Sequence, residues 1–314
     1  MVSNSQTLSV KKVAKKWQKH LKQFWPLYLF LLPALLDVII FRYAPMYGLQ
    51  IAFRDFKIRK GFWGSEWVGL EHFIKFVNAP NFWQLLRNTL SLSVKSLLWG
   101  FPVPVILALM LNEIRSSKVK RVVQTITYAP HFLSMVAMVG LINLLLARET
   151  GLINNMLVSL GMERQNFLIM PSAYQPIYIL SGIWQEAGWG SIIYLAALTS
   201  IDQEMMEAAQ IDGANRFQKI WYIDIPSILP TIVIMLIMRS GSLLSVGYEK
   251  VLLLQNDLIR DVSEIISTYN YRMGILQGKY SYTTAIGLFN SLVNGIILLS
   301  VNKISKVVTE TSLW

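Results

Sequence analysis

Charged side chains lie inside three of the long apolar segments of this 314-residue chain, where an ionisable group is costly. They are Lys95, Glu186 and Arg239. At 1.5 Å per helical residue, they lie about 11, 18 and 14 Å from one end of their apolar segments. Charged groups at such depth usually face the interior of a helix bundle or a water-filled cavity. The sequence therefore predicts a polar layer inside a membrane-embedded bundle.

Amide and aromatic side chains accompany these charges, because Trp184 and Trp189 flank Gln185 and Glu186 in the sequence. One interpretation is a transport path through the bundle. The alternative is structural, with a salt bridge such as Glu186–Arg239 and an aromatic belt at the membrane surface. The candidate path residues are Lys95, Trp184, Gln185, Glu186, Trp189, Arg239, Asn290 and Asn294.

Patterns that carry catalysis are missing from the sequence. There is no cysteine, and the three histidines (His20, His72 and His131) are scattered, so we expect no metal site. Neither G-x-x-x-x-G-K-[ST], H-E-x-x-H nor G-x-S-x-G occurs. We therefore expect no catalytic residues, and any ATP-driven step requires another protein.

The elements that hold the polar residues are predicted to be transmembrane helices. Hydrophobic residues make up 54% of the chain and charged residues 15%, against about 25% charged in ordinary globular proteins. Six segments reach the roughly 20 apolar residues that a bilayer requires. We attribute the net charge of +11 to contact with anionic lipids and expect no nucleic-acid partner. The predicted spans are 26–48, 88–112, 122–147, 174–200, 226–248 and 283–303.

Residues 1–25 form a separate basic segment. Val10, Val13 and Trp17 recur at helical spacing while lysines fill the other faces, which predicts an amphipathic helix on the membrane surface. An unstructured basic tail that only fixes topology is the alternative. Lys and Arg are denser in the segments that share a side with the termini, so we expect both ends, including the tail 304–314, to be cytoplasmic.

The loop over residues 200–226 is predicted to form a helix–turn–helix on the cytoplasmic face. Ser200 with Gln203 fits a capping box, and Gly213 suits the left-handed position that ends a helix. A second short helix is expected over 214–221, before Pro226 opens the next span. The alternative is a plain loop packed on its own bundle.

The residues of this loop resemble the EAA motif of bacterial ABC importer permeases. Glu207-Ala208-Ala209 precedes Asp212-Gly213-Ala214, and Ile225-Pro226 stands where the family usually has Leu-Pro. The resemblance implies a coupling helix that docks into a cleft of an ATPase. The coupling residues that it implies are Glu207, Ala208, Ala209, Asp212 and Gly213.

Other stretches, 29–56, 67–76 and 88–93, resemble the LplB-type, MalF-like permeases of carbohydrate importers. This resemblance implies an all-α, polytopic type I ABC importer permease fold with six transmembrane helices over 26–303. It also implies oligosaccharide uptake and no enzyme activity or cofactor in this chain, since ATP and Mg²⁺ would bind the partner ATPase. The implied partners are a second permease forming a heterodimer, two cytoplasmic ATPase copies and an extracellular solute-binding lipoprotein, which the loops 52–83 and 249–282 are long enough to meet.

The competing class is a six-span channel or an integral-membrane transferase that is not coupled to an ATPase. A channel has no need of an ATPase-docking helix. A transferase would require clustered carboxylates or histidines at one membrane face, and the sequence contains no such cluster.

Overall fold

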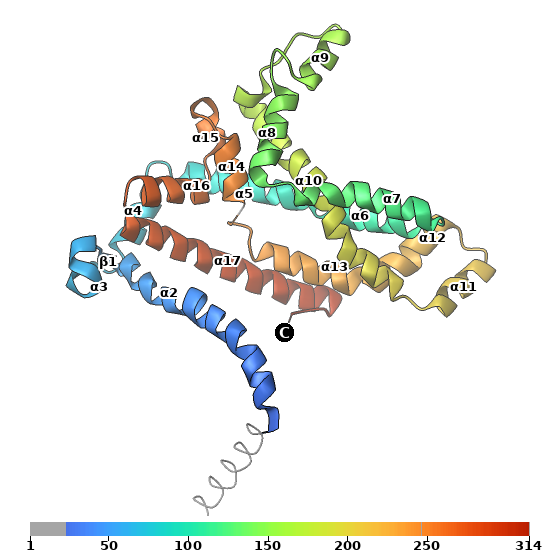
Figure 1. The fold of residues 1–314 in the computed structure, drawn as a ribbon, viewed down its shortest axis with the longest axis horizontal. Coiled ribbons are helices and arrows are strands. Elements are labelled where there is room, and N and C mark those ends of the chain that lie inside the picture. The colour runs from blue at the N-terminus through green and yellow to red at the C-terminus, as the bar shows by residue number, and fades with distance from the viewer. Residues whose placement is uncertain (1–22, 246, 314) are drawn as a thin grey trace, which may run out of the picture. The chain divides into compact units, whose positions relative to one another are not determined.

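The computed structural model of the chain describes residues 23–245 and 247–313, and these residues are mainly helical (Figure 1). The amphipathic helix predicted over residues 1–25 lies almost wholly outside the described residues. The chain divides into two compact units, Met1–Gly69 and Leu70–Trp314.

The described part of the first unit begins with a helix of 31 residues, Gln23–Phe53. Its course includes a π-helical turn η1 (Ile39–Tyr43), the short α2 (Ala44–Met46) and a closing 3₁₀ turn η2 (Tyr47–Phe53). Pro45 accounts for the π turn, because a proline lacks an N–H and its ring clashes with the carbonyl four residues earlier. That carbonyl belongs to Phe41, inside the wider turn.

A small hairpin closes this unit. Strands β1 (Arg54–Asp55) and β2 (Glu66–Trp67) pair antiparallel, with Arg54 opposite Trp67. Between them lie η3 (Ile58–Lys60) and α3 (Gly61–Gly64).

The second unit contains the remaining helices. Its first half contains α4 (Glu71–Val77), α5 (Phe82–Gly100), α6 (Pro102–Asn112), α7 (Ser117–Tyr128), η4 (Ala129–Phe132), α8 (Met135–Leu146), α9 (Leu152–Ser159) and η5 (Phe167–Ile169). Its second half contains α10 (Pro171–Thr199), α11 (Gln203–Ile211), α12 (Arg216–Lys219), η6 (Ile220–Asp224), α13 (Ile225–Ser240), α14 (Tyr248–Leu254), η7 (Asp257–Ile259), α15 (Arg260–Ser263), α16 (Ile266–Tyr271), η8 (Arg272–Leu276) and α17 (Tyr280–Thr309).

Four helices in the described part are long and apolar enough to cross a membrane. They are Gln23–Phe53, Phe82–Asn112, Arg216–Ser240 and Tyr280–Thr309. The pair Ser117–Phe132 and Met135–Leu146 adds a fifth if it counts as one broken span. The chain is therefore a multi-pass membrane protein. By length and composition, the described helices provide four or five spans rather than the predicted six.

Two of the predicted spans differ from the observed helices for identifiable reasons. The helix expected over 122–147 bends by 102° between Phe132 and Met135. Here the Ser134 hydroxyl accepts a hydrogen bond from the backbone N–H of Ala137 at 3.2 Å and caps a new helix, so a single continuous helix was the wrong expectation. The span expected over 226–248 already ends at Ser240.

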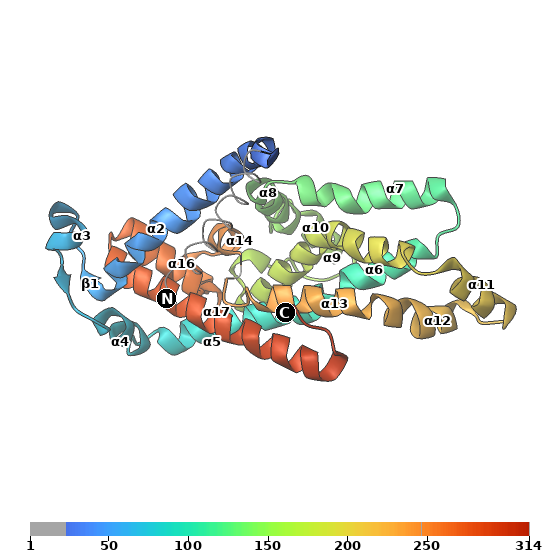
Figure 2. The ribbon, with the colours of Figure 1, turned by 90° about the horizontal axis from the view of Figure 1, so that it is seen from below.

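Helix α10 covers the fourth predicted span and is 29 residues long, but it is not one of the four helices that are long and apolar enough to cross a membrane. Gln175, Gln185 and Glu186 lie within it. It is also the most central helix of the second unit, since it packs against α5, α6, α7 and α13 (Figure 2). At Gly188 the backbones of α10 and α7 approach so closely that a Cβ atom would lie 2.0 Å from the Thr127 carbonyl oxygen.

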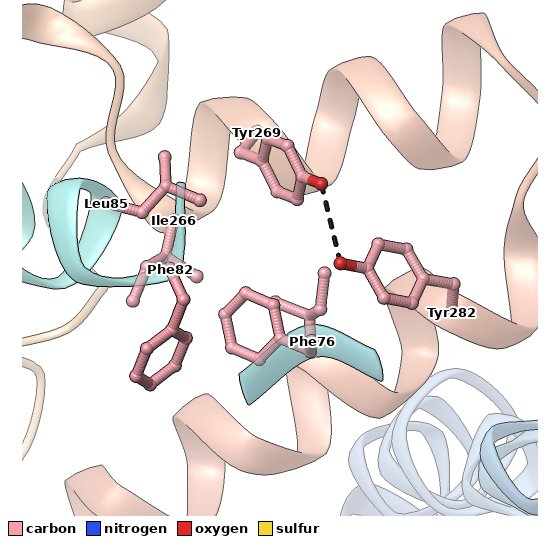
Figure 3. Packing of buried hydrophobic residues seen from close by; sticks show 7 residues of the cluster. Phe76, Phe82, Leu85, Ile266, Tyr269 and Tyr282 are labelled. Carbon is pink, nitrogen blue, oxygen red and sulfur yellow. Dashed lines mark hydrogen bonds between the residues drawn. The ribbon is translucent and has the colours of Figure 1, made fainter. Parts of the chain in front are cut away.

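Apolar clusters join the helices at both ends of this unit. At one end, Phe76, Phe82 and Ile266 pack with Tyr269 and Tyr282, whose hydroxyl groups lie 3.4 Å apart (Figure 3). A second cluster joins α6, α10 and α13 next to the segment that carries the EAA-like motif, and its buried members are Ala108, Leu109, Leu111, Tyr194, Leu195, Leu198 and Ile228. These clusters fix the helices between which the polar side chains lie.

Candidate functional site

The middle of α10 carries Gln185 and Glu186, which contact the bend between η4 and α8. The buried Gln185 amide donates to the Leu133 carbonyl oxygen at 3.2 Å. The Glu186 carboxylate lies 3.1 Å from Nδ1 of His131. The alternative of a Glu186–Arg239 salt bridge is not realised among the described residues, because His131 is the partner of Glu186.

Both tryptophans expected in the path lie on α10. Trp189 stacks on His131 with ring centroids 4.5 Å apart, and Phe132 meets its edge at 5.6 Å. Trp189 and Trp184 remain 44% and 49% exposed. Their exposed aromatic faces beside polar groups are the kind of surface on which a sugar ring can stack.

Glu186 and Gln185 also line a cavity of about 200 Å³ that contains two cations, Arg239 and Lys250. Lys250 lies in α14 and is only 4% exposed. Its ammonium group donates to the Tyr178 carbonyl oxygen at 2.9 Å and lies 4.7 Å from the centroid of the Tyr178 ring. The cavity therefore joins charges from α10, α13 and α14.

Lys95 lies in a different cavity, of about 670 Å³, on the α5 side of α10. Its ammonium group donates to the Gln175 side-chain oxygen at 2.6 Å. Ile179 and Ile183 line this cavity and also the smaller one with Arg239 and Lys250. The two cavities thus adjoin along α10.

The two asparagines of α17 do not line either cavity. Asn294 accepts from the Leu244 backbone N–H at 2.9 Å and donates to the Ser245 hydroxyl at 3.0 Å, so it secures the irregular segment after α13. The Asn290 side-chain oxygen is buried without a hydrogen-bond partner in the described structure. The structure therefore separates these asparagines from Gln185 and Glu186, with which they were grouped.

Lys250 and His131 were missed as site residues. Lys250 follows the expected end of a span at residue 248, so it was counted with a loop, and His131 was set aside as one of three scattered histidines. The early end of α13 and the bend before α8 place them beside Glu186. No cluster of three or more His, Asp or Glu side chains within the described ranges could hold a metal ion.

The EAA-like segment forms α11, and its N-terminus differs from the expected capping box. Asp202, rather than Ser200, is the N-cap, and its carboxylate accepts from the Glu204 backbone N–H at 2.9 Å. The hydroxyl of Ser200 instead donates to the Ala197 carbonyl oxygen. The N-cap therefore lies two residues later than expected, and Glu207 lies in the middle of the helix.

Gly213 ends α11 as predicted, with φ of +77°. Its N–H donates to the Gln210 carbonyl oxygen at 3.2 Å, and the N–H of Ala214 donates to the Ala209 carbonyl oxygen at 2.9 Å. These two hydrogen bonds form a Schellman motif. The second helix is not a separate short helix over 214–221. It begins after Asn215, which forms a capping box with Gln218, and continues through the π turn η6 to Ser240. Like η1, this π turn contains the carbonyl four residues before a proline, here Pro226.

The segment over residues 203–222, which includes α11 and α12, presents charged and apolar side chains outward. Glu207, Ala208, Asp212 and Gly213 are exposed, and Ala209 is half-buried. Large apolar side chains near them are also exposed, namely Ile211 (86%), Phe217 (76%), Trp221 (66%) and Tyr222 (80%). A mainly polar hollow of about 570 Å³, lined by Glu113, Gln203, Gln210 and Arg216 among others, lies between this segment and the turn after α6.

The architecture of these helices, with the EAA-like segment before α13, matches a known family. Residues 100–308 match the family model described as "Binding-protein-dependent transport system inner membrane component". The chain belongs to this family and is the membrane-embedded permease subunit of an ABC importer rather than an enzyme. This membership decides against a channel or an integral-membrane transferase.

Individual relatives cover nearly the whole chain. Protein LplB of Bacillus subtilis is 46% identical over 298 residues, which cover 95% of this chain and 94% of the relative. The polygalacturonan/rhamnogalacturonan transport system permease protein YteP of the same organism is 46% identical, covering 92% of this chain and 90% of the relative. In a crystal structure of a bacterial alginate ABC transporter in complex with an alginate pentasaccharide-bound periplasmic protein, one chain is similar with a TM-score of 0.86 and 43% identity, over 94% of this chain and 99% of that one.

Proposed function

We propose that this permease subunit imports an oligosaccharide that an extracellular solute-binding protein delivers. The similarity to YteP and to the alginate transporter chain, over more than nine tenths of this chain, is the observation that carries the proposal. One of these relatives is named for polygalacturonan and rhamnogalacturonan transport, and the other was crystallised with an alginate pentasaccharide-bound periplasmic protein. The exposed tryptophans beside Glu186 and Gln185 offer a surface that suits sugar rings.

The proposed assembly contains a second permease, two copies of a cytoplasmic ATPase and the binding protein. In it this chain spans the membrane six times with both termini in the cytoplasm. The third span is the bent pair α7–α8 and the fourth is α10, whose polar side chains face cavities rather than lipid. No cofactor binds this chain, and ATP with Mg²⁺ binds the ATPase.

In this assembly residues 203–222 form a coupling segment that transmits ATP-driven motion to the helices. Its outward apolar side chains support a docking role, because Phe217 and Tyr222 would otherwise expose large apolar surfaces to water. Glu207 offers a charge to a basic or amide partner in the ATPase cleft. The short α11, capped at both ends, is stiff enough to follow that cleft as the ATPase pair closes.

ATP hydrolysis by the reconstituted complex tests the proposal. We expect the purified chain to hydrolyse no ATP until the ATPase is added. We then expect binding protein loaded with oligosaccharide to stimulate hydrolysis. Stimulation by amino acids or peptides, and by no sugar, would contradict the proposed substrate class.

A further inference from the structure

We propose that the cavity lined by Arg239, Lys250 and Glu186 binds an acidic group of the sugar, so that the transported oligosaccharide is an anion. This inference rests on the proposed function, because it names the charge of the glycan that the path carries. It concerns residues that the EAA-like motif does not include.

Lys250 is a buried cation whose direct contacts are with neutral groups. Its ammonium group contacts the carbonyl oxygen and the ring of Tyr178. A Cβ atom at Gly182 would lie 3.4 Å from Nζ, so the ammonium group packs directly against α10. Within the described part of the chain no carboxylate lies within 4 Å of Nζ. A buried charge without an opposite charge in contact is costly, so an anionic ligand in this cavity would be strongly favoured.

Arg239 is the second cation of the cavity, and its guanidinium group forms no hydrogen bond or ion pair with the described residues. Its place in the last turn of α13 is favourable because a helix C-terminus attracts a positive charge. This electrostatic attraction uses none of the five N–H donors of the guanidinium group, so they are available to a ligand. Their planar arrangement fits a carboxylate with two parallel hydrogen bonds.

The surrounding helices supply too few anions to neutralise these cations. Glu186 is the only Asp or Glu in α5, α6, α7, α8, α10 and α13, and Glu249 of α14 is exposed and does not line the cavity. Its carboxylate already contacts His131. With two cations and one carboxylate, the cavity carries a net charge of +1 before His131 is counted.

The adjoining cavity extends the positive charge along α10. Lys95 is held by the neutral side chain of Gln175, and no acidic residue lines that cavity. Ile179 and Ile183 line both cavities, so the cations lie on one route. A chain of sugars with several carboxylates can contact Lys95 and the Arg239–Lys250 pair in succession.

The test compares acidic oligosaccharides with their methyl esters, which keep the sugar skeleton but lack the charge. ATP hydrolysis by the reconstituted complex is measured with binding protein and a panel of galacturonate and alginate oligosaccharides, their methyl esters, and neutral oligosaccharides. We expect the acids to stimulate hydrolysis more than their esters. The same binding protein is used throughout, so its own preference cancels when variants are compared with the unaltered complex.

Arg239→Gln should lower the acid-to-ester ratio by about 10- to 100-fold, as expected for the loss of a hydrogen bond to a charged group. Lys250→Gln should do the same, and Lys250→Arg should restore part of the preference if the variant folds. Lys303→Gln removes an exposed cation from α17 and should leave the ratio unchanged. The Arg239 side chain has no hydrogen-bond or ion-pair partner to lose among the described residues, so its variant remains informative even if Lys250→Gln fails to fold.

Three results separate the possible failures. An unchanged ratio in both Arg239→Gln and Lys250→Gln would overturn the anion site. Stimulation by neutral oligosaccharides but by no acidic one would also overturn it, while leaving oligosaccharide import intact. No stimulation by any glycan would reject the proposed function itself.

Discussion

The imidazole of His131 lies parallel to the indole of Trp189, with ring centroids 4.5 Å apart and ring planes 2° apart. The same imidazole contacts the Glu186 carboxylate through Nδ1. His131 therefore covers one face of Trp189 while it is held by a side chain that lines the small cavity. A sugar ring that stacks on this face must displace the imidazole.

Removing this cover should strengthen sugar binding. His131→Ala is expected to lower the half-saturating glycan concentration in uptake assays by about 2- to 10-fold, the range that an aromatic contact of about 0.5–1.5 kcal/mol allows. Trp189→Ala should raise that concentration, and the double variant should behave like Trp189→Ala alone. An unchanged half-saturating concentration in His131→Ala would show that sugar does not use this face.

Asn294 and Glu186 should respond differently to alanine. Asn294→Ala removes two hydrogen bonds to the segment after α13, so we expect a loss of about 2 kcal/mol in the free energy of unfolding and a lower thermal midpoint. Glu186→Ala removes a half-exposed side chain and should change uptake while the midpoint stays close to that of the unaltered chain. A thermal unfolding series on the assembled complex distinguishes the two. Equal midpoints for all three proteins would contradict the structural role of Asn294.

Glu207→Lys tests the coupling role of α11. The position is exposed, so a segment without a partner would tolerate the change with little effect on folding. In the proposed complex it places a cation where the ATPase cleft is expected to hold a basic or amide group. We expect uptake to be lost, with weaker ATPase docking or with ATP hydrolysis that no longer responds to sugar. Glu204→Lys, in the first turn of the same helix, provides a matched charge control. Normal sugar-stimulated hydrolysis in Glu207→Lys would reject the coupling role.

Gly213 allows the turn that follows α11 to be tested through backbone conformation alone. Its φ is +77°, and a Cβ atom added there would meet no other atom within 4 Å, so only the conformation resists a side chain. Gly213→Val should uncouple hydrolysis from uptake because a β-branched residue is strained there. Gly213→Asn should retain most of the activity, since asparagine tolerates the left-handed region. Equal activity of the two variants would exclude a conformational role for this glycine.

The sequence predicted the apolar elements better than the contacts between them. Hydrophobic length placed segments such as 88–112 and 283–303 within the observed helices Phe82–Asn112 and Tyr280–Thr309. Glycine chemistry also predicted the end of α11 at Gly213. The bend before α8 could not be predicted in this way, because a serine cap interrupts an apolar run without changing its hydropathy.

The side-chain contacts of the candidate site depend on where the helices bend or end. The Glu186–Arg239 pair was a reasonable expectation from depth alone, yet the bend brings His131 to Glu186 instead. Lys250 enters the cavity only because α13 ends at Ser240 and the chain returns as α14. The position of α14 beside α10 depends on tertiary packing, which the hydrophobic pattern of the sequence does not reveal.

Uptake into proteoliposomes tests the central claim most directly. The complex of this chain with its second permease and ATPase is reconstituted with the ATPase and ATP inside the vesicles, and labelled oligosaccharide is supplied with binding protein outside. We predict that sugar accumulates only when ATP, ATPase and binding protein are all present, and that Glu207→Lys in this chain abolishes accumulation. Accumulation without ATP, or undiminished accumulation by the Glu207→Lys complex, would contradict the account.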